Sequence, residues 1–428
     1  MEEIIDRAIA PDIHNMGRLS LPEAETMTLP NGLTLHFLSG GNADVSRIKI
    51  LLPGGIAESP RPKLLEIANS LLLEGTVNHS GEQLSDIIEH NGAWTGIETS
   101  THHSALSVYC LNSTYRTLLP LVNEIVLSPA FDPEATSHVV RNEAARLEVD
   151  HHKVLYRAGC AMRNLIYGPE HPLSAVPSPE ELMGITPEML AEAHNARLDP
   201  SGMHVYISGL LSDSMINEAA GIFSAIPSHN PYPLPPLRFP EHTSGGKTHV
   251  DMPDSLQSGV KLMIPAIGRN HPDYVPLRIA TVALGGYFGS RLMLNIREEK
   301  GLTYGITASL IGYRHSGFIS ISSQTDPSTA DLLISETIAE IERMKNPDSY
   351  TADEVNRISR FVLSELAGVL DTPFSRMDFL QTQVTASTPA GYFAMQDNAA
   401  RQLTSEMLAS MAEKYFDTDR LFIATAGK

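Results

Sequence analysis

The 428-residue sequence predicts an α+β fold with two homologous domains, each an antiparallel sheet with helices packed on it. Two observations predict this fold. Residues 48–53 (IKILLP) match residues 260–265 (VKLMIP), and the same shift of 212 residues pairs Pro60 with Pro272. In addition, strands and helices follow one another in pairs, without the regular alternation that a parallel sheet requires. A duplicated α+β unit is therefore expected.

A proline-rich stretch, residues 227–236 (PSHNPYPLPP), lies between the two repeats. Closely spaced prolines favour an extended chain over a helix or a central strand. We therefore expect a linker at 229–240, an N-terminal domain over 1–228 and a C-terminal domain over 241–428.

The first helix is predicted from its apolar spacing. Residues 60–75 place Leu64, Ile67 and Leu71 on one helical face, and Gly75 is a typical helix end. The pattern therefore predicts a helix with its apolar face against a sheet.

Capping residues mark two further helices. Ser80 followed by Gln83 forms a capping box, and Asp132 before Pro133 is a typical helix start. The expected segments of the first half are strands at 33–38 and 48–52, a helix at 60–75, a helix from Ser80, paired strands within 96–111, and helices at 115–126 and 132–152.

The charge balance excludes one class of partner. Thirty-one Lys and Arg residues against 50 Asp and Glu give a net charge of −19, which repels phosphate backbones. No stretch reaches the roughly 20 apolar residues of a membrane helix, and residues 1–7 lack the apolar region of a secretory signal. Cys110 and Cys160 are expected to be reduced thiols. These features predict a cytoplasmic protein with no nucleic-acid or membrane partner.

Four segments carry a resemblance to a known family: 285–304 (GGYFGSRLMLNIREEKGLTY), 73–76 (LEGT), 170–172 (EHP) and 204–209 (HVYISG). With them, the sequence resembles the pitrilysin/insulinase family of zinc peptidases, particularly small bacterial members related to the mitochondrial processing peptidase. The resemblance implies two related domains of the metallopeptidase (LuxS/processing-peptidase-like) fold. In dimeric members of the family, four such domains enclose a chamber for unfolded peptides.

The family's catalytic motif, H-x-x-E-H, places two His on one helical face around a zinc ion, with the Glu as general base. Alignment on Gly75 puts Glu66, Asn69 and Ser70 at the His, Glu and His positions, and Glu148 at the position of the distal ligand. An amide is no general base, and a serine hydroxyl is a poor zinc ligand. The sequence therefore predicts a degenerate zinc site, no catalytic residue and no metal cofactor in this chain.

Other residues offer a rebuilt metal site as an alternative. Residues 86–90 (DIIEH) imitate the motif on the next helix, and His102-His103 and His151-His152 are adjacent pairs. Adjacent side chains point to different faces of a helix or strand, so neither pair grips a metal by itself. We therefore expect no metal site from these residues.

The second half keeps more of the family pattern. Residues 290–300 are expected to form a helix ended by Gly301, followed by a strand at 302–308. The resemblance implies that Arg297 and Tyr304 hold the backbone of a bound peptide, because both side chains donate hydrogen bonds to carbonyl oxygens. A helix-terminal Arg and a Tyr packed on the sheet are the structural alternative.

These expectations combine into a function. The chain is predicted to be a non-catalytic, substrate-positioning subunit of a heterodimeric zinc peptidase that acts on unfolded peptides, its partner being a homologous subunit that carries the zinc. A structural subunit, like the inactive family members in a respiratory complex, and a peptide-binding homodimer without proteolysis are the alternatives. The acidic balance would favour basic peptides.

Overall fold

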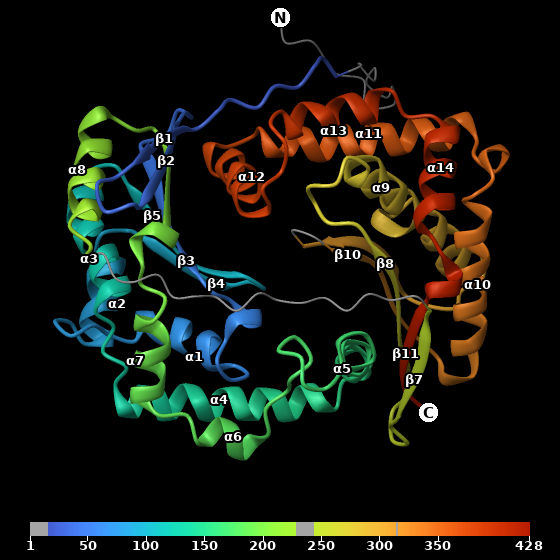
Figure 1. Cartoon of the computed structure of the whole chain (residues 1–428), viewed down its shortest axis with the longest axis horizontal. Coiled ribbons are helices and arrows are strands. Elements are labelled where there is room, and N and C mark those ends of the chain that lie inside the picture. Colours follow the sequence, from blue (N-terminus) through green and yellow to red (C-terminus); the bar gives the residue numbers. More distant parts are fainter. Residues whose placement is uncertain (1–15, 228–243, 314–315) are drawn as a thin grey trace, which may run out of the picture.

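The computed structural model describes residues 16–227, 244–313 and 316–428 (Figure 1). The predicted domain limits, 228 and 241, and the predicted linker at 229–240 lie outside the described residues. A six-stranded sheet belongs to the first half and a five-stranded sheet to the second. The strands are β1 (Glu25–Thr28), β2 (Thr34–Ser39), β3 (Val45–Pro53), β4 (Trp94–Thr99), β5 (His103–Leu111) and β6 (His204–Gly209), then β7 (Gly246–Asp251), β8 (Ser258–Ala266), β9 (Ile306–Gly312), β10 (Gly317–Thr325) and β11 (Phe422–Gly427).

Five strands of each sheet follow one topology, and β1 is an additional edge strand of the first sheet. Their orders are β1-β2-β6-β3-β5-β4 and β7-β11-β8-β10-β9. In each sheet one pair is parallel, β2 with β6 and β7 with β11, and the other pairs are antiparallel. The α+β prediction is confirmed, but the sheets are mixed and not purely antiparallel. The last strand of each half returns after a long helical crossover, which is the connection that parallel pairing needs.

Helices surround both sheets, and within the described residues none combines the length and apolar character needed to cross a bilayer. They are α1 (Leu64–Ser70), α2 (Gly81–His90), α3 (Tyr115–Leu127), α4 (Pro133–His151), α5 (Val154–Tyr167), α6 (Pro179–Met183), α7 (Pro187–Asn195) and α8 (Asp213–Ser224), then α9 (Tyr274–Thr281), α10 (Ala330–Arg343), α11 (Ala352–Val369), α12 (Pro373–Ala386), α13 (Tyr392–Arg401) and α14 (Ser405–Tyr415).

Local signals set most helix starts as expected. Ser80 caps α2 and completes a capping box with Gln83, and Asp132 caps α4 ahead of Pro133. The first predicted helix, 60–75, is shorter: α1 starts only at Leu64 and is followed by a 3₁₀ turn. The delay has a backbone cause, because Lys63 has a left-handed conformation (φ 68°) that a helix does not accommodate.

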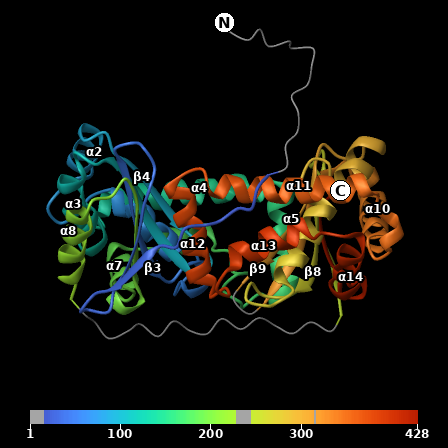
Figure 2. The same ribbon diagram turned by 90° about the horizontal axis from the view of Figure 1, so that it is seen from above.

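Each sheet buries one face against helices of its own half. In the first half, Leu118 of α3 and Phe223 of α8 pack with Ile48 of β3 in one apolar core. In the second half, Leu333 of α10 and Leu408 of α14 join the core that lies over β8 and β10. Figure 2 shows the two sheets at opposite ends of the molecule, with α12 and α13 between them.

Helix α5 belongs to the first half by sequence, yet it packs on the second sheet. Met162 and Ile166 of α5 form an apolar cluster with Met263 of β8, Phe318 of β10 and Phe422 of β11. In Figure 1, α5 lies beside β8 and β11, away from the first sheet. The second sheet is therefore covered on this face by the other half of the chain.

Helix α12 makes the reciprocal contact. Its Met377 packs in a cluster with Leu51 of β3 and Tyr206 of β6. Arg47 of β3 donates a hydrogen bond of 2.8 Å to Asp378 of α12, which also forms an ion pair. One helix of each half therefore packs on the sheet of the other half.

Candidate functional site

Asn69, at the general-base position of the degenerate motif, is buried on α1 with 1% of its surface exposed. Its Nδ2 donates hydrogen bonds of 2.7 Å to Thr99 Oγ1 and 2.8 Å to Ser104 Oγ. Its Oδ1 accepts a hydrogen bond from Nη2 of Arg197, and Nη1 of Arg197 donates to Ser104 Oγ at 2.9 Å. The buried Asn69 amide therefore forms three hydrogen bonds at the position where the family has its general base.

Arg197 is a buried cation held by neutral acceptors. It is 2% exposed, and burial lowers its pKa to about 9, so the guanidinium remains charged at neutral pH. Its Nη2 lies 3.1 Å from Nδ1 of His194, whose Nε2 donates to the carbonyl oxygen of Val126 at 2.7 Å. The second bond requires the proton on Nε2, which leaves Nδ1 as the acceptor for Arg197.

The other three motif positions do not converge on one point. Glu66 Oε1 lies 2.6 Å from Lys63 Nζ in an ion pair, and the exposed Ser70 hydroxyl donates to the Ile67 carbonyl oxygen at 2.8 Å. Glu148 is exposed on α4. The α4 carboxylate that reaches α1 is instead that of Glu143, 3.3 Å from Lys63 Nζ.

This arrangement does not fit a zinc ion. A catalytic zinc site needs three protein ligands and one open position. Here the central amide is fully engaged, and a guanidinium within hydrogen-bond distance of it would repel a divalent cation. Across the described segments, no group of three or more His, Cys, Asp or Glu side chains is placed to hold a metal ion.

The alternative metal residues have other contacts. His102 Nδ1 donates to Glu58 Oε1 at 2.7 Å, and burial lowers the pKa of the neighbouring His103. The ring of His151 lies 5.6 Å from that of Tyr156. His102 and His151 therefore each contact a different residue and share no common point.

We expect His194 to make the protein sensitive to mild acid. Burial, then the charge of Arg197, lowers its pKa from 6.5 to about 3, so the unfolded chain takes up the proton first as the pH falls. The associated stability is present above pH 6.5 and is lost progressively toward pH 3. At 1.36 kcal/mol per pH unit, the loss reaches about 2 kcal/mol at pH 5.

Urea unfolding at pH 7 and pH 5 checks this expectation. The His194→Gln variant should lose about 2 kcal/mol less than the wild type between these pH values. His152→Gln, which changes an exposed histidine, should keep the wild-type difference. An unchanged pH dependence in the His194 variant would contradict the assignment.

The structure brings Arg297 and Tyr304 together. Arg297 lies in the last turn of a π-helical segment (Met293–Glu299), with its guanidinium carbon 5.4 Å from the ring centre of Tyr304. The ring centre of a third residue, Phe288, lies 4.7 Å from the same guanidinium carbon. The Tyr304 and Phe288 side chains are 91% and 65% exposed, so both rings face solvent. The pair is a cation between two exposed aromatic rings, and the tyrosine is not packed on the sheet.

The strand predicted at 302–308 begins later, at Ile306, so Tyr304 lies in the connecting turn. The cause is Thr303, whose hydroxyl donates to the carbonyl oxygen of Gln324 at 2.5 Å and accepts from the backbone N–H of Gly305 at 3.1 Å. These bonds hold the chain out of the ladder for residues 301–305. The turn leaves the Tyr304 side chain projecting outward.

The sequence prediction missed Arg197, His194 and Phe288. Arg197 lies 128 residues from Asn69, so no spacing rule connects the two. Phe288, by contrast, lies inside the segment 285–304 that carried the family resemblance. An aromatic residue in the same segment as Arg297 and Tyr304, the two residues predicted to clamp the peptide, was the available signal.

Parts of the sequence match a known protein family and several of its relatives. Residues 184–361 match the family model described as the peptidase M16 inactive domain. An uncharacterized zinc protease of Mycobacterium leprae (strain TN) is 26% identical over 281 residues, which make up 63% of this chain and 62% of that protein. The probable inactive metalloprotease YmfF of Bacillus subtilis (strain 168) is 20% identical over 275 residues, 63% of this chain and 64% of its own length.

The matched part therefore spans less than two thirds of either relative. A solved structure agrees over more of the chain. The crystal structure of the peptidase M16 inactive domain from Pseudomonas fluorescens superposes with a TM-score of 0.86, covering 94% of this chain and 98% of that one at 22% identity. At this identity the agreement concerns the fold.

Proposed function

We propose that this chain is a member of the peptidase M16 family and serves as a non-catalytic, substrate-positioning subunit of a heterodimeric zinc peptidase. Its partner would be a homologous subunit with an intact zinc motif, and its substrates would be unfolded peptides. The cytoplasm, as the sequence predicts, is the proposed compartment.

One contrast supports the proposal. At the zinc position, Asn69 and Arg197 form a buried network with no general base and no open ligand position. At the positions predicted to hold the peptide, the half-buried Arg297 lies beside Tyr304, which is exposed. The chain therefore has the residues proposed to bind a peptide, but it lacks the residues that would hydrolyse the peptide.

The chemistry of the clamp suits an extended peptide. The guanidinium of Arg297 has one ion-pair contact, 3.5 Å from Glu298 Oε1, and offers further N–H groups to carbonyl oxygens. The flanking rings fix its plane by cation–π contact, so little side-chain freedom would be lost on binding. Such positioning raises the rate of a reaction that another subunit catalyses.

A structural subunit remains the second candidate for this fold. It would have no use for a cation–aromatic group that is open to solvent, because such a group stabilises the chain little. Peptide cleavage by the native complex separates the two functions.

Purification of the native complex through this chain tests the proposal. We expect a second chain with the H-x-x-E-H motif, about one zinc per pair and cleavage of unstructured peptides. The isolated chain should bind no stoichiometric zinc and cleave nothing. About one zinc per isolated chain, lost on Glu148→Ala, would overturn the assignment. A homodimer without zinc or cleavage would favour the non-proteolytic alternatives.

A further inference from the structure

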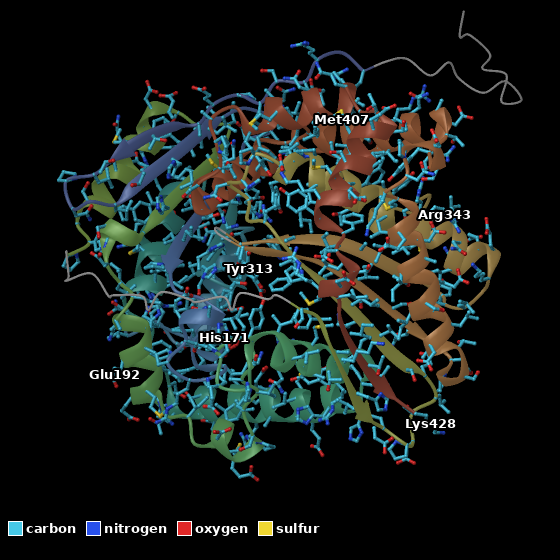
Figure 3. All side chains as sticks on the ribbon, turned by 45° about the vertical axis from the view of Figure 1, so that its right-hand side comes forward. His171, Glu192, Tyr313, Arg343, Met407 and Lys428 are labelled. Carbon is cyan, nitrogen blue, oxygen red and sulfur yellow. The ribbon has the colours of Figure 1, made fainter. Side chains whose placement is uncertain are left out.

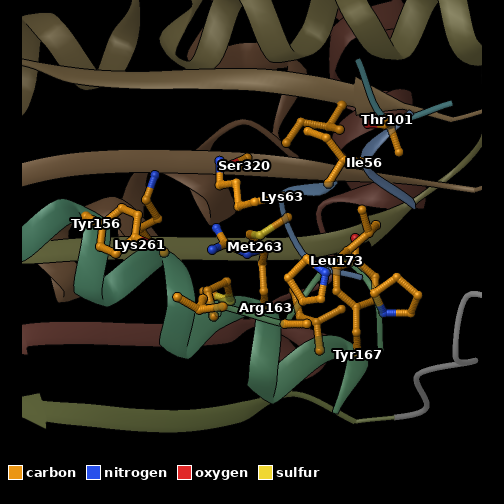
Figure 4. Close-up of a pocket in the computed structure, with 18 of the residues that line it drawn as sticks. Ile56, Lys63, Thr101, Tyr156, Arg163, Tyr167, Leu173, Lys261, Met263 and Ser320 are labelled. Atoms are coloured by element: carbon orange, nitrogen blue, oxygen red, sulfur yellow. The ribbon is translucent and has the colours of Figure 1, made fainter. Parts of the chain in front are cut away.

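A cavity of about 430 Å³ lies where α5 meets the second sheet (Figure 4). Its size is in the range of small-ligand sites. Much of the wall is apolar and includes Met162, Ile166, Met263 and Ile311. Tyr313, which also lines it, lies toward the middle of the molecule, between the two halves (Figure 3). The cavity therefore opens inside the molecule and combines residues of both halves.

Two cations reach this cavity from opposite walls. Arg163 comes from α5 and Lys261 from β8, and both line the cavity (Figure 4). A Cβ atom placed on Gly159 would lie 3.6 Å from Arg163 Nη1 and 3.5 Å from Lys261 Cε. Both side chains therefore pass within van der Waals contact of the same point above α5.

Within the described residues, each of these cations has a neutral hydrogen-bond partner. Arg163 Nη2 donates to Cys160 Sγ at 3.2 Å, and Lys261 Nζ donates to Ser322 Oγ at 3.2 Å. No carboxylate of the described chain forms an ion pair with either cation. The carboxylate of Glu66 lines the same cavity, but it is paired with Lys63.

The pair is electrostatically costly without a ligand. Burial and the nearby charge of Arg163 lower the pKa of Lys261, because both effects disfavour its protonated form. A guanidinium has five N–H donors and an ammonium three, so each group retains donors that could face a ligand. An anion between them would relieve the repulsion and satisfy those donors.

We propose that this cavity binds a carboxylate of the peptide substrate, either an acidic side chain or the C-terminal carboxylate, while the apolar wall receives a neighbouring side chain. The proposal rests on the proposed function for the identity of the ligand as a peptide. The local charge is opposite to the net charge of −19, so this site would select acidic peptides although the whole molecule is acidic.

Binding of labelled peptides to the isolated full-length chain, followed by fluorescence anisotropy, tests the site. Three unstructured peptides differ only in charge: one with an internal Glu and an amidated end, one with Gln and a free C-terminus, and one with Gln and an amidated end. We expect at least one carboxylate peptide to bind roughly 10-fold or more tightly than the neutral peptide. The peptide that binds identifies the source of the carboxylate. Equal affinities for all three would overturn the proposal.

Matched variants localise the binding. Arg163→Met and Lys261→Met should each remove most of the preference for the carboxylate peptide. Arg157→Met, on the same helix but outside the cavity wall, and Lys247→Met, on the exposed side of β7, make the same charge change elsewhere and should keep it. Thermal melting of each variant confirms folding. Equal losses in cavity and control variants would contradict the site.

This result is separable from the proposed function. Binding is measured without a catalytic partner, so a carboxylate preference can stand even where no zinc subunit is found. Conversely, a partnered peptidase could cleave neutral and acidic peptides alike, and the cavity proposal alone would then fail.

Discussion

The Arg297→Ala variant should lower peptide turnover by the assembled peptidase roughly 10- to 100-fold, because a charge-assisted hydrogen bond contributes about 1.5–3 kcal/mol. The guanidinium lies between exposed rings, so its removal deletes a peptide contact and leaves no buried group unsatisfied. Arg297→Lys should restore only part of the activity, since an ammonium does not reproduce the planar fork. Tyr304→Phe should lower turnover less, through one hydroxyl.

Turnover and melting temperature must be measured on the same samples. Arg360→Ala changes an exposed arginine on α11 and should leave turnover near the wild-type value. Unchanged turnover in a stable Arg297→Ala complex would show that the cation–aromatic group is only structural. Loss of the complex itself would place the residue at a subunit contact and would also refute the clamp.

The Asn69→Ala variant should lose about 3 kcal/mol of unfolding free energy, the largest stability effect that we expect at the former zinc position. Asn69 Oδ1 accepts from a buried guanidinium, and its removal leaves that charge short of one acceptor. Nε of Arg197 already lacks a hydrogen-bond partner within the described chain, so the loss of Asn69 would leave a second donor of this buried guanidinium unpaired. Asn69→Asp should be milder, because a carboxylate accepts from Arg197 and the Thr99 hydroxyl can reorient as a donor.

Urea unfolding at pH 7 compares these variants. Ser70→Ala removes an exposed hydroxyl from the same helix and should change stability by no more than about 0.5 kcal/mol. Similar small changes for Asn69→Ala and Ser70→Ala would mean that the buried network is not a structural replacement for the metal site.

Sequence patterns predicted the features that depend on neighbouring residues. The capping box at Ser80 and the start of α4 after Asp132 are local hydrogen-bond arrangements, and both are confirmed. The repeat predicted two units of one kind, and five strands of each sheet share one topology. The parallel pairs β2/β6 and β7/β11 were missed because each joins strands separated by most of a half.

In the candidate site, too, contacts between residues close in sequence were predicted and contacts between distant residues were not. Arg297 and Tyr304 are seven positions apart in one segment, and the structure places them in contact. Arg197 meets Asn69 only in the folded first half, and Arg163 meets Lys261 only because a first-half helix packs on a second-half strand. The exposed position of Glu148 has the same explanation, since spacing along α4 did not reveal which face meets α1.

The exchange of α5 and α12 between the halves bears on how this chain can evolve. After a duplication, two self-sufficient copies can drift apart, and either can be lost. Here each sheet is covered on one face by a helix that the other copy encodes. A substitution that destabilises one half therefore also destabilises the sheet of the other half. Selection on stability then acts on the two copies together.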